Sequence, residues 1–247
     1  MNNLPAHRES LMVRKASRIA LLLFWVFLSA LPACAETAWV SAERDTTLIE
    51  DPDGALSNGS GPALFAGRTN QGVGSVRRGL LRFDVAAALP PRAIVESVVL
   101  HLTALPGNPG ASSVRLYRVL ADWGEGASFS TGGRGAPSEP GDATWIHRFY
   151  DSEFWEYAGG QFVGSASAEF TVNGAREYVV ADSPKLLADV RLWSAAPARN
   201  FGWILIGDET RPQSAQPLAT RENPDPAVRP VLEVVYRVAG MSGRPMR

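Results

Sequence analysis

The stretch RRGLLRFDV, residues 77–85, decides the fold class because apolar and charged side chains alternate along it. Alternation with a period of two is typical of a β-strand that packs one face on a core. Leu81 and Phe83 fall on the apolar face, whereas Arg78 and Arg82 fall on the other. The guanidinium groups have two interpretations: they solvate the outside of a sheet, or they bind an anionic ligand.

Similar strand patterns recur along the chain and are separated by turns rich in glycine and proline. Within residues 93–105, Val98, Leu100 and Leu102 alternate with a second set of side chains and make one face fully apolar. Residues 202–207, GWILIG, are apolar on both faces and predict a central strand. Many short strands with such punctuation are typical of a β-sandwich or barrel. The expected strands are 37–42, 46–50, 63–69, 79–85, 93–105, 113–123, 166–172, 176–181, 202–208, 217–223 and 230–238.

One segment, SPKLLADVRLWSAAP at residues 183–197, has a helical period instead. Leu186, Val190 and Trp193 recur at helical spacing. Ser183 suits an N-cap, and the prolines at either end suit a first helical turn and a helix stop. We expect one short amphipathic helix that covers an end or an open edge of the sandwich.

The composition restricts the class of protein further. The chain has 247 residues, a formal net charge of −1, 23 glycines, 18 prolines and 20% charged residues. This length suits one large domain with a substantial core, and the glycine and proline content favours a turn-rich β protein. A near-zero net charge argues against a general nucleic-acid-binding protein.

The first 35 residues have the pattern of a signal peptide. A basic segment, MVRKASR, precedes the apolar IALLLFWVFLSALPA, and ACAET supplies a small-x-small cleavage site. Cleavage after Ala35 would leave a mature chain that begins at Glu36. No later segment is apolar over the roughly 20 residues that a membrane-spanning helix needs. We therefore expect a secreted, periplasmic or extracellular domain at 36–238, followed by a disordered tail at 239–247.

A second interpretation of the N-terminal segment concerns Cys34, the one cysteine of the chain. The sequence LPAC, Leu31–Cys34, resembles a bacterial lipobox, in which the cysteine is lipidated and becomes the first residue. The protein would then be an outer-envelope lipoprotein with a lipid anchor at Cys34. Both interpretations predict export from the cytoplasm.

The region 124–164 has weak strand signals, and long loops are often functional. Trp145, His147, Arg148 and Trp155 cluster in it. Aromatic rings stack on the C–H-rich faces of sugars, and arginine pairs with carboxylates. The alternative is that the two tryptophans fold inward as the core of the loop.

Motifs for catalysis are lacking in the sequence. It has no G-x-S-x-G elbow, H-E-x-x-H pair, phosphate loop or set of cysteine ligands, so no enzymatic activity is predicted. Acidic residues in and near the long region leave a polysaccharide hydrolase or lyase as an alternative, since the spacing of a carboxylate pair is spatial rather than sequential.

Taken in order, several short pieces of the chain resemble the DNRLRE domain, a bacterial extracellular module that is grouped in part with carbohydrate-binding modules. The resemblance implies a jelly-roll-type β-sandwich without catalytic residues. Some relatives are modules of polysaccharide-degrading enzymes, so the implied activity is binding of an acidic polysaccharide of the alginate type. The pieces are DTTLIE, NGSGPALFAGRT, RRGLLRFDV, RVLADWGEG, GDATWIHRFY, LLADVRLW, NFGWILIGDE, TREN and RPVLEVVY.

Arg82 and a set of acidic residues each have two interpretations. In the family signatures LRFD and TREN, Arg82 either pairs with Glu222 across neighbouring strands or contacts ligand. Asp45, Asp51 and Asp53 are candidate oxygen ligands for a structural calcium ion, which the resemblance makes plausible. The alternative for the last two is a turn that their side chains stabilise.

The predicted function is non-catalytic binding of carbohydrate on a β-sandwich, with a structural or adhesive envelope protein as the alternative. The expected ligand is an anionic polysaccharide, with no nucleic-acid partner and no cofactor beyond the calcium ion considered above. Arginine side chains on a sheet face would supply charge, and aromatic side chains would supply stacking. The candidate binding residues are Arg78, Arg82, Arg115, Tyr117, Trp145, His147, Arg148 and Trp155.

Lipidation at Cys34 has a direct test. If the lipobox interpretation is correct, cells that express the full chain should incorporate labelled palmitate into it, and Cys34→Ser should abolish the incorporation. If the signal-peptide interpretation is correct, the wild-type chain should carry no label and its mature form should begin at Glu36 by N-terminal sequencing.

Overall fold

The computed structural model describes residues 35–108, 110–181 and 183–239. The expected signal peptide up to Cys34 and the tail beyond Ala239 lie outside the described residues. The strands are β1 Glu36–Ile49, β2 Leu56–Ser57, β3 Ala63–Arg68, β4 Val76–Phe83, β5 Ala93–Ala104, β6 Ser112–Arg118, β7 Ala136–Pro137, β8 His147–Phe149, β9 Glu153–Phe154, β10 Ala168–Val172, β11 Arg176–Val180, β12 Trp203–Ile206, β13 Gln216–Ala219 and β14 Val231–Val238. The helices are α1 Val85–Ala88 and α2 Pro184–Ala195, with 3₁₀ turns η1 Pro197–Arg199 and η2 Pro226–Val228.

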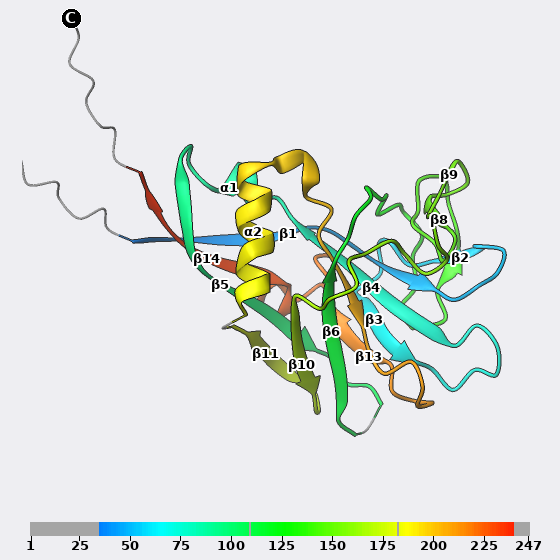
Figure 1. Ribbon diagram of the computed structural model, residues 1–247. Coiled ribbons are helices and arrows are strands. Elements are labelled where there is room, and N and C mark those ends of the chain that lie inside the picture. The colour runs from blue at the N-terminus through cyan, green and yellow to red at the C-terminus, as the bar shows by residue number, and fades with distance from the viewer. Residues whose placement is uncertain (1–34, 109, 182, 240–247) are drawn as a thin grey trace, which may run out of the picture. The chain divides into compact units, whose positions relative to one another are not determined.

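Two antiparallel sheets make up the sandwich (Figure 1). The first sheet has the order β1-β14-β5-β13-β3, and β11 pairs with β5 on the edge opposite β14. The second sheet has the order β1-β4-β12-β6-β10. Strand β1 belongs to both, because residues 36–41 pair with β14 and residues 42–49 pair with β4. The two patterns expected as separate strands at 37–42 and 46–50 are therefore one strand that passes from sheet to sheet.

The core lies between the inner faces of these sheets and follows the predicted alternation. Leu81 and Phe83 of β4 are fully buried in it. Leu100 and Leu102 of β5 are buried as well, whereas His101 between them lies on the outer face. Strand β12 pairs with β4 on one side and β6 on the other, which confirms GWILIG as a central strand. The predicted all-β sandwich is confirmed.

The predicted amphipathic helix is α2. The Ser183 hydroxyl caps it by accepting a hydrogen bond from the Leu186 amide, and the side chains of Leu186, Val190 and Trp193 enter the core. The helix packs against β5 and α1 (Figure 1). The one-turn helix α1 was not predicted: Asp84 caps it through the Ala87 amide, so β4 ends one residue before this cap.

Asp189 fixes α2 to the second sheet. Its carboxylate accepts hydrogen bonds from Trp203 Nε1 at 2.9 Å and from the Ser167 hydroxyl at 2.5 Å. It also pairs with Arg118 Nε at 2.9 Å. The side chain is almost completely buried, so these three donors replace its lost hydration.

Region 124–164 covers the outer face of the second sheet, so it is not an exposed loop. Leu80 and Ile204 project from that face and are fully buried under it, together with Trp123 and Trp155. The short strands β8 and β9 of this region gather with β2 at the end of the molecule away from α2 (Figure 1). The sandwich therefore has a second, smaller hydrophobic cluster outside the main core.

Neither helix of the described chain is long and apolar enough to cross a membrane.

Loss of the Asp189 carboxylate should destabilise the fold. Asp189→Ala would leave the buried indole N–H of Trp203 and the guanidinium of Arg118 without their acceptor, at a cost of about 3 kcal/mol. Urea denaturation followed by tryptophan fluorescence measures this. Lys185→Ala, an exposed position of the same helix, is the control and should leave the free energy of unfolding nearly unchanged. Equal stability of Asp189→Ala and wild type would contradict the assignment.

Candidate functional site

Arg78 lies on the outer face of the second sheet, as predicted, but its guanidinium is already bound. It pairs with both carboxylate oxygens of Glu209, at 2.6 and 3.0 Å, and donates to the carbonyl of Gly159 at 2.7 Å. Its side chain is only 16% exposed. The group therefore fixes the covering region to β4 and has little surface left for a ligand.

Three of the predicted residues come together beside this ion pair. The Arg78 guanidinium carbon lies 4.9 Å from the ring centroid of Trp145 and 5.7 Å from that of Phe162. Phe162 in turn lies 5.4 Å from the ring of Tyr117. Arginine over aromatic faces is a favourable cation–π arrangement. The rings of Tyr117, Trp145 and Phe162 are half-buried and pack against the second hydrophobic cluster.

Trp155 and His147 lie inside the covering region. Trp155 is 5% exposed, and its indole N–H donates to the Thr144 carbonyl at 3.0 Å. His147 is buried beside Thr144 and contacts the ring of Phe154 at a centroid distance of 4.5 Å. Burial lowers the pKa of His147, which keeps the imidazole neutral at physiological pH. The interpretation of an inward-folded loop core holds for Trp155.

Arg82 does not pair with Glu222, so that prediction is wrong. Its guanidinium pairs with Glu43 at 3.1 Å and lies 3.8 Å from Asp122, whereas Glu222 pairs with Arg221. The physical reason is register: Arg82 lies opposite Arg44 of β1, which brings the neighbouring Glu43 within reach.

The two remaining predicted arginines differ in exposure. Arg148 pairs with Glu153 of the same hairpin and donates to the Asp122 carbonyl at 3.3 Å. Arg115 pairs with Glu169 of the adjacent strand β10 at 3.1 Å, and its side chain is 52% exposed. Arg115 is thus the most exposed of the four predicted arginines, and the Glu169 carboxylate neutralises its charge.

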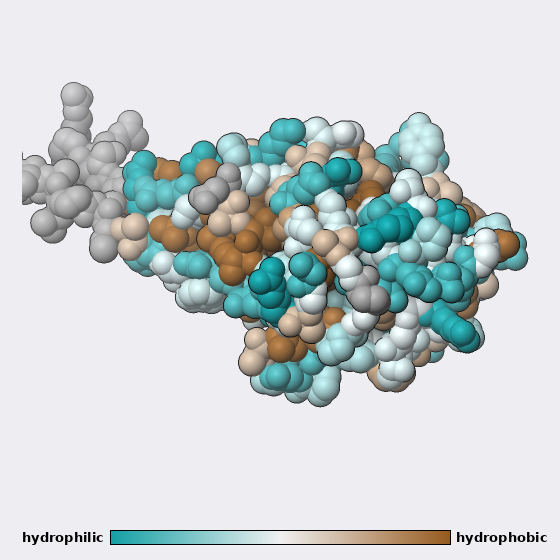
Figure 2. Space-filling view, turned by 90° about the horizontal axis from the view of Figure 1, so that it is seen from below, coloured by the Kyte–Doolittle hydropathy of each residue, from teal (hydrophilic) through white to brown (hydrophobic). Residues whose placement is uncertain are grey.

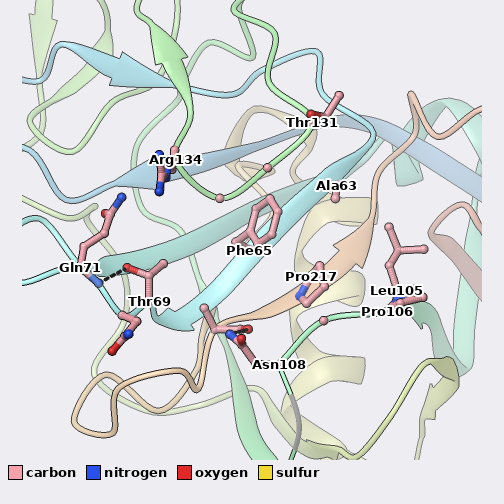
Figure 3. A pocket seen from close by; sticks show the side chains of 15 residues that line it. Ala63, Phe65, Thr69, Gln71, Leu105, Pro106, Asn108, Thr131, Arg134 and Pro217 are labelled. Atoms are coloured by element: carbon pink, nitrogen blue, oxygen red, sulfur yellow. Dashed lines mark hydrogen bonds between the residues drawn. The ribbon is translucent and has the colours of Figure 1, made fainter.

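An open cleft of about 560 Å³ lies on the outer side of the first sheet, away from all of these residues. Phe65 of β3 stands at its centre, since its neighbours Leu64 and Ala66 point into the core. Figure 3 shows Gln71 and Arg134 to one side of this ring, and Pro217, Leu105 and Pro106 to the other. Asn108 and Thr131 close the remaining sides (Figure 3).

Several polar side chains of this cleft have atoms that are free to bind a ligand. Arg134 is exposed and makes no ion pair or side-chain hydrogen bond with any described residue. Gln71 uses its side-chain carbonyl to accept from Arg77, and Asn108 uses its amide nitrogen to donate to Ala215. The opposite ends of both amides remain for a ligand. None of the described residues that line the cleft is acidic.

Arg77, which is fully buried, holds one wall of the cleft in place. Its guanidinium donates to the carbonyls of Gly133 and Gly74 and to the side chain of Gln71. Burial lowers the pKa of Arg77 to about 10, although the nearby Glu50 carboxylate opposes the shift. The group therefore stays charged at neutral pH, and Gly133 and Gln71 are positioned by it.

Sequence reasoning missed this cleft. Phe65 and Gln71 come from one stretch of the chain, Asn108 and Arg134 from two others, and each looks like an ordinary strand or turn residue. The long region was expected to be functional, and its turn at 131–134 does line the cleft. The signal that could have found it is TGGRG at 131–135, a cation among glycines that let the backbone approach Phe65.

The acidic residues considered for calcium separate into two groups. Asp51 accepts hydrogen bonds from the amides of Asp53 and Ala55, which is the turn interpretation. Asp45 instead meets Glu125 and Glu222, with one oxygen of each carboxylate within 4.8 Å of the others. Among the residues that the structure describes, these three are the ones grouped closely enough to hold a metal, and the sequence indicated one of them.

The functional argument rests on the residues of this chain. No protein-family model and no curated protein matches it.

Removal of the Arg77 guanidinium should unfold more than the cleft wall. Arg77→Met would leave the half-buried carbonyls of Gly133 and Gly74 without their donor, at a cost of about 3 kcal/mol by chemical denaturation. Arg115→Ala is the control for loss of an arginine, because its single ion pair is exposed, and should leave stability nearly unchanged. A larger loss for Arg115→Ala than for Arg77→Met would refute the assignment.

Proposed function

We propose that this protein is a non-catalytic binding module for carbohydrate, with an anionic polysaccharide of the alginate type as ligand. One observation carries the proposal: the cleft joins an unpaired arginine, Arg134, to an aromatic ring, Phe65, without an acidic residue among its described lining. A guanidinium forms charge-assisted hydrogen bonds with carboxylates, and an aromatic ring stacks on the C–H face of a sugar.

The proposal moves the binding site from the arginine face of the second sheet to the cleft of the first. On the predicted face, Arg78 and Arg82 are paired with acidic side chains, and Trp155 is buried. In the cleft, the free ends of Gln71 and Asn108 can bind sugar hydroxyl groups. The cleft is open, which suits a chain-like ligand that extends beyond it.

The resemblance to the DNRLRE domain supports the same function and an exported location, in which a module of this kind meets polysaccharide. The proposed mechanism is contact with several sugar units at once. No step of bond cleavage is part of it.

A structural or adhesive role is the second candidate, and an apolar area on the first sheet favours it. Trp39 is 62% exposed and Val179 is 57% exposed on the outer face of this sheet. The ring of Trp39 lies 5.6 Å from that of His101, which pairs in register with Val179. Figure 2 shows hydrophobic atoms gathered at the end where β1 begins and β14 ends. Exposed apolar area of this kind is typical of a protein contact.

Affinity gel electrophoresis against alginate, pectin and a neutral glucan tests the proposal. The anionic polysaccharides should retard the protein, and the retardation should weaken as salt rises because ions screen the charge contacts. Arg134→Ala should lower the affinity about tenfold, and Phe65→Leu should lower it while the fold is kept. Arg115→Ala, an exposed arginine outside the cleft, is the matched control.

Three outcomes contradict the proposal. Retardation by none of the polysaccharides rejects glycan binding and leaves the adhesive role. Loss of binding in Arg115→Ala but not in Arg134→Ala places the ligand on the second sheet. Release of reducing ends or unsaturated products from the same polysaccharides would show an enzyme.

A further inference from the structure

Three carboxylates from distant parts of the chain converge at one buried point. Asp45 lies in β1, Glu125 at the start of the covering region and Glu222 just after β13, with one oxygen of each within 4.8 Å of the others. Asp45 is completely buried. Its Oδ1, like Oε2 of Glu222, is shielded from solvent and has no hydrogen-bond partner. Two acceptor atoms in this cluster therefore lack a donor.

Arg221 supplies the positive charge at this point, but one positive charge does not neutralise three carboxylates. Its guanidinium binds both oxygens of Glu125 at 2.7 and 2.6 Å and one oxygen of Glu222 at 2.8 Å. Its backbone amide donates to Asp45 Oδ2 at 2.8 Å. With every group ionised, one guanidinium faces three carboxylates. Arg44, the residue before Asp45, is directed to Asp122 instead.

The uncompensated charge has a cost at neutral pH. Burial raises the pKa of Asp45 well above its usual range, and the carboxylates of Glu222 and Glu125 raise it further. Burial and Glu125 likewise raise the pKa of Glu222. Like charges at this separation in a low-dielectric site repel strongly, so a cation among the three carboxylates would relieve the repulsion.

We propose that Asp45, Glu125 and Glu222 bind a divalent cation of the calcium type. All three donors are carboxylates, which are hard oxygen ligands that calcium prefers over softer metals. Glu125 can take part through Oε2, which accepts one hydrogen bond from Arg221 and has a further lone pair, whereas Oε1 accepts from both Arg221 and the Asp45 amide. Calcium also tolerates the irregular geometry of ligands that come from a strand and two loops, whereas magnesium demands a near-ideal octahedron.

The ion would join three segments that the strand ladders do not connect. It would tie β1 to the start of the region that covers the second sheet and to the segment after β13. Its role is structural, and it is independent of the proposed glycan cleft. Binding to the folded state alone raises the stability of the protein as the concentration of the ion rises.

The test uses the full chain after treatment with a chelator. Titration with CaCl₂ in a calorimeter should show one site, and an excess of about 100-fold over Kd should raise Tm by roughly 5 °C or more. MgCl₂ should produce a smaller rise. An unchanged Tm together with no heat of binding would overturn the proposal, and so would a response to magnesium without one to calcium.

Variants locate the site. Glu222→Gln should abolish the calcium-dependent rise in Tm, whereas Asp53→Asn, an exposed acid outside the cluster, should retain it. Glu222→Asp, which keeps the charge but shortens the ligand, replaces Glu222→Gln if that variant does not fold, and it should weaken calcium binding. Retention of the response in Glu222→Gln, or its loss in Asp53→Asn, would place the ion elsewhere and overturn the assignment.

Discussion

The buried guanidinium of Arg77 joins β4 to the covering region, with which β4 shares no strand ladder. It reaches the β3–β4 turn through Gly74 and Gln71, and the covering region through Gly133. Taking a charge out of water is costly, so it is tolerated here only because oxygen acceptors surround it. The hydrogen bonds from Arg77 hold Gly133 and Gln71 in place, and these two residues form part of the wall of the proposed binding cleft.

The same physical logic extends along the second sheet. Arg78, Arg82 and Arg44 each find a carboxylate on a neighbouring strand or loop, and the half-buried position of these pairs keeps them more effective than pairs in open solvent. The rings of Trp145 and Phe162 lie against Arg78 and complete the contact. Arg78 thus attaches the covering region to β4, and Arg82 attaches β4 to β1.

Both proposed ligand sites contain charged groups that the described residues do not neutralise. Arg134 has no acidic partner among the described residues, and the cluster of Asp45, Glu125 and Glu222 has more acid than Arg221 can neutralise. They are proposed to bind ligands of opposite sign, an anionic polysaccharide at the first and a cation at the second.

The sequence by itself determined most of the longer strands of the sandwich, the helix with its Ser183 cap, and the outward placement of Arg78, Arg82 and Arg115. These features follow from alternation and capping, which are local properties of the backbone. Only the tertiary structure decided that residues 124–164 cover one sheet, that Phe65 and Arg134 share a cleft, and that Asp45 meets Glu222 rather than Asp51. Each of these contacts joins segments far apart in the chain, so their proximity depends on strand register and loop path, which no local pattern encodes.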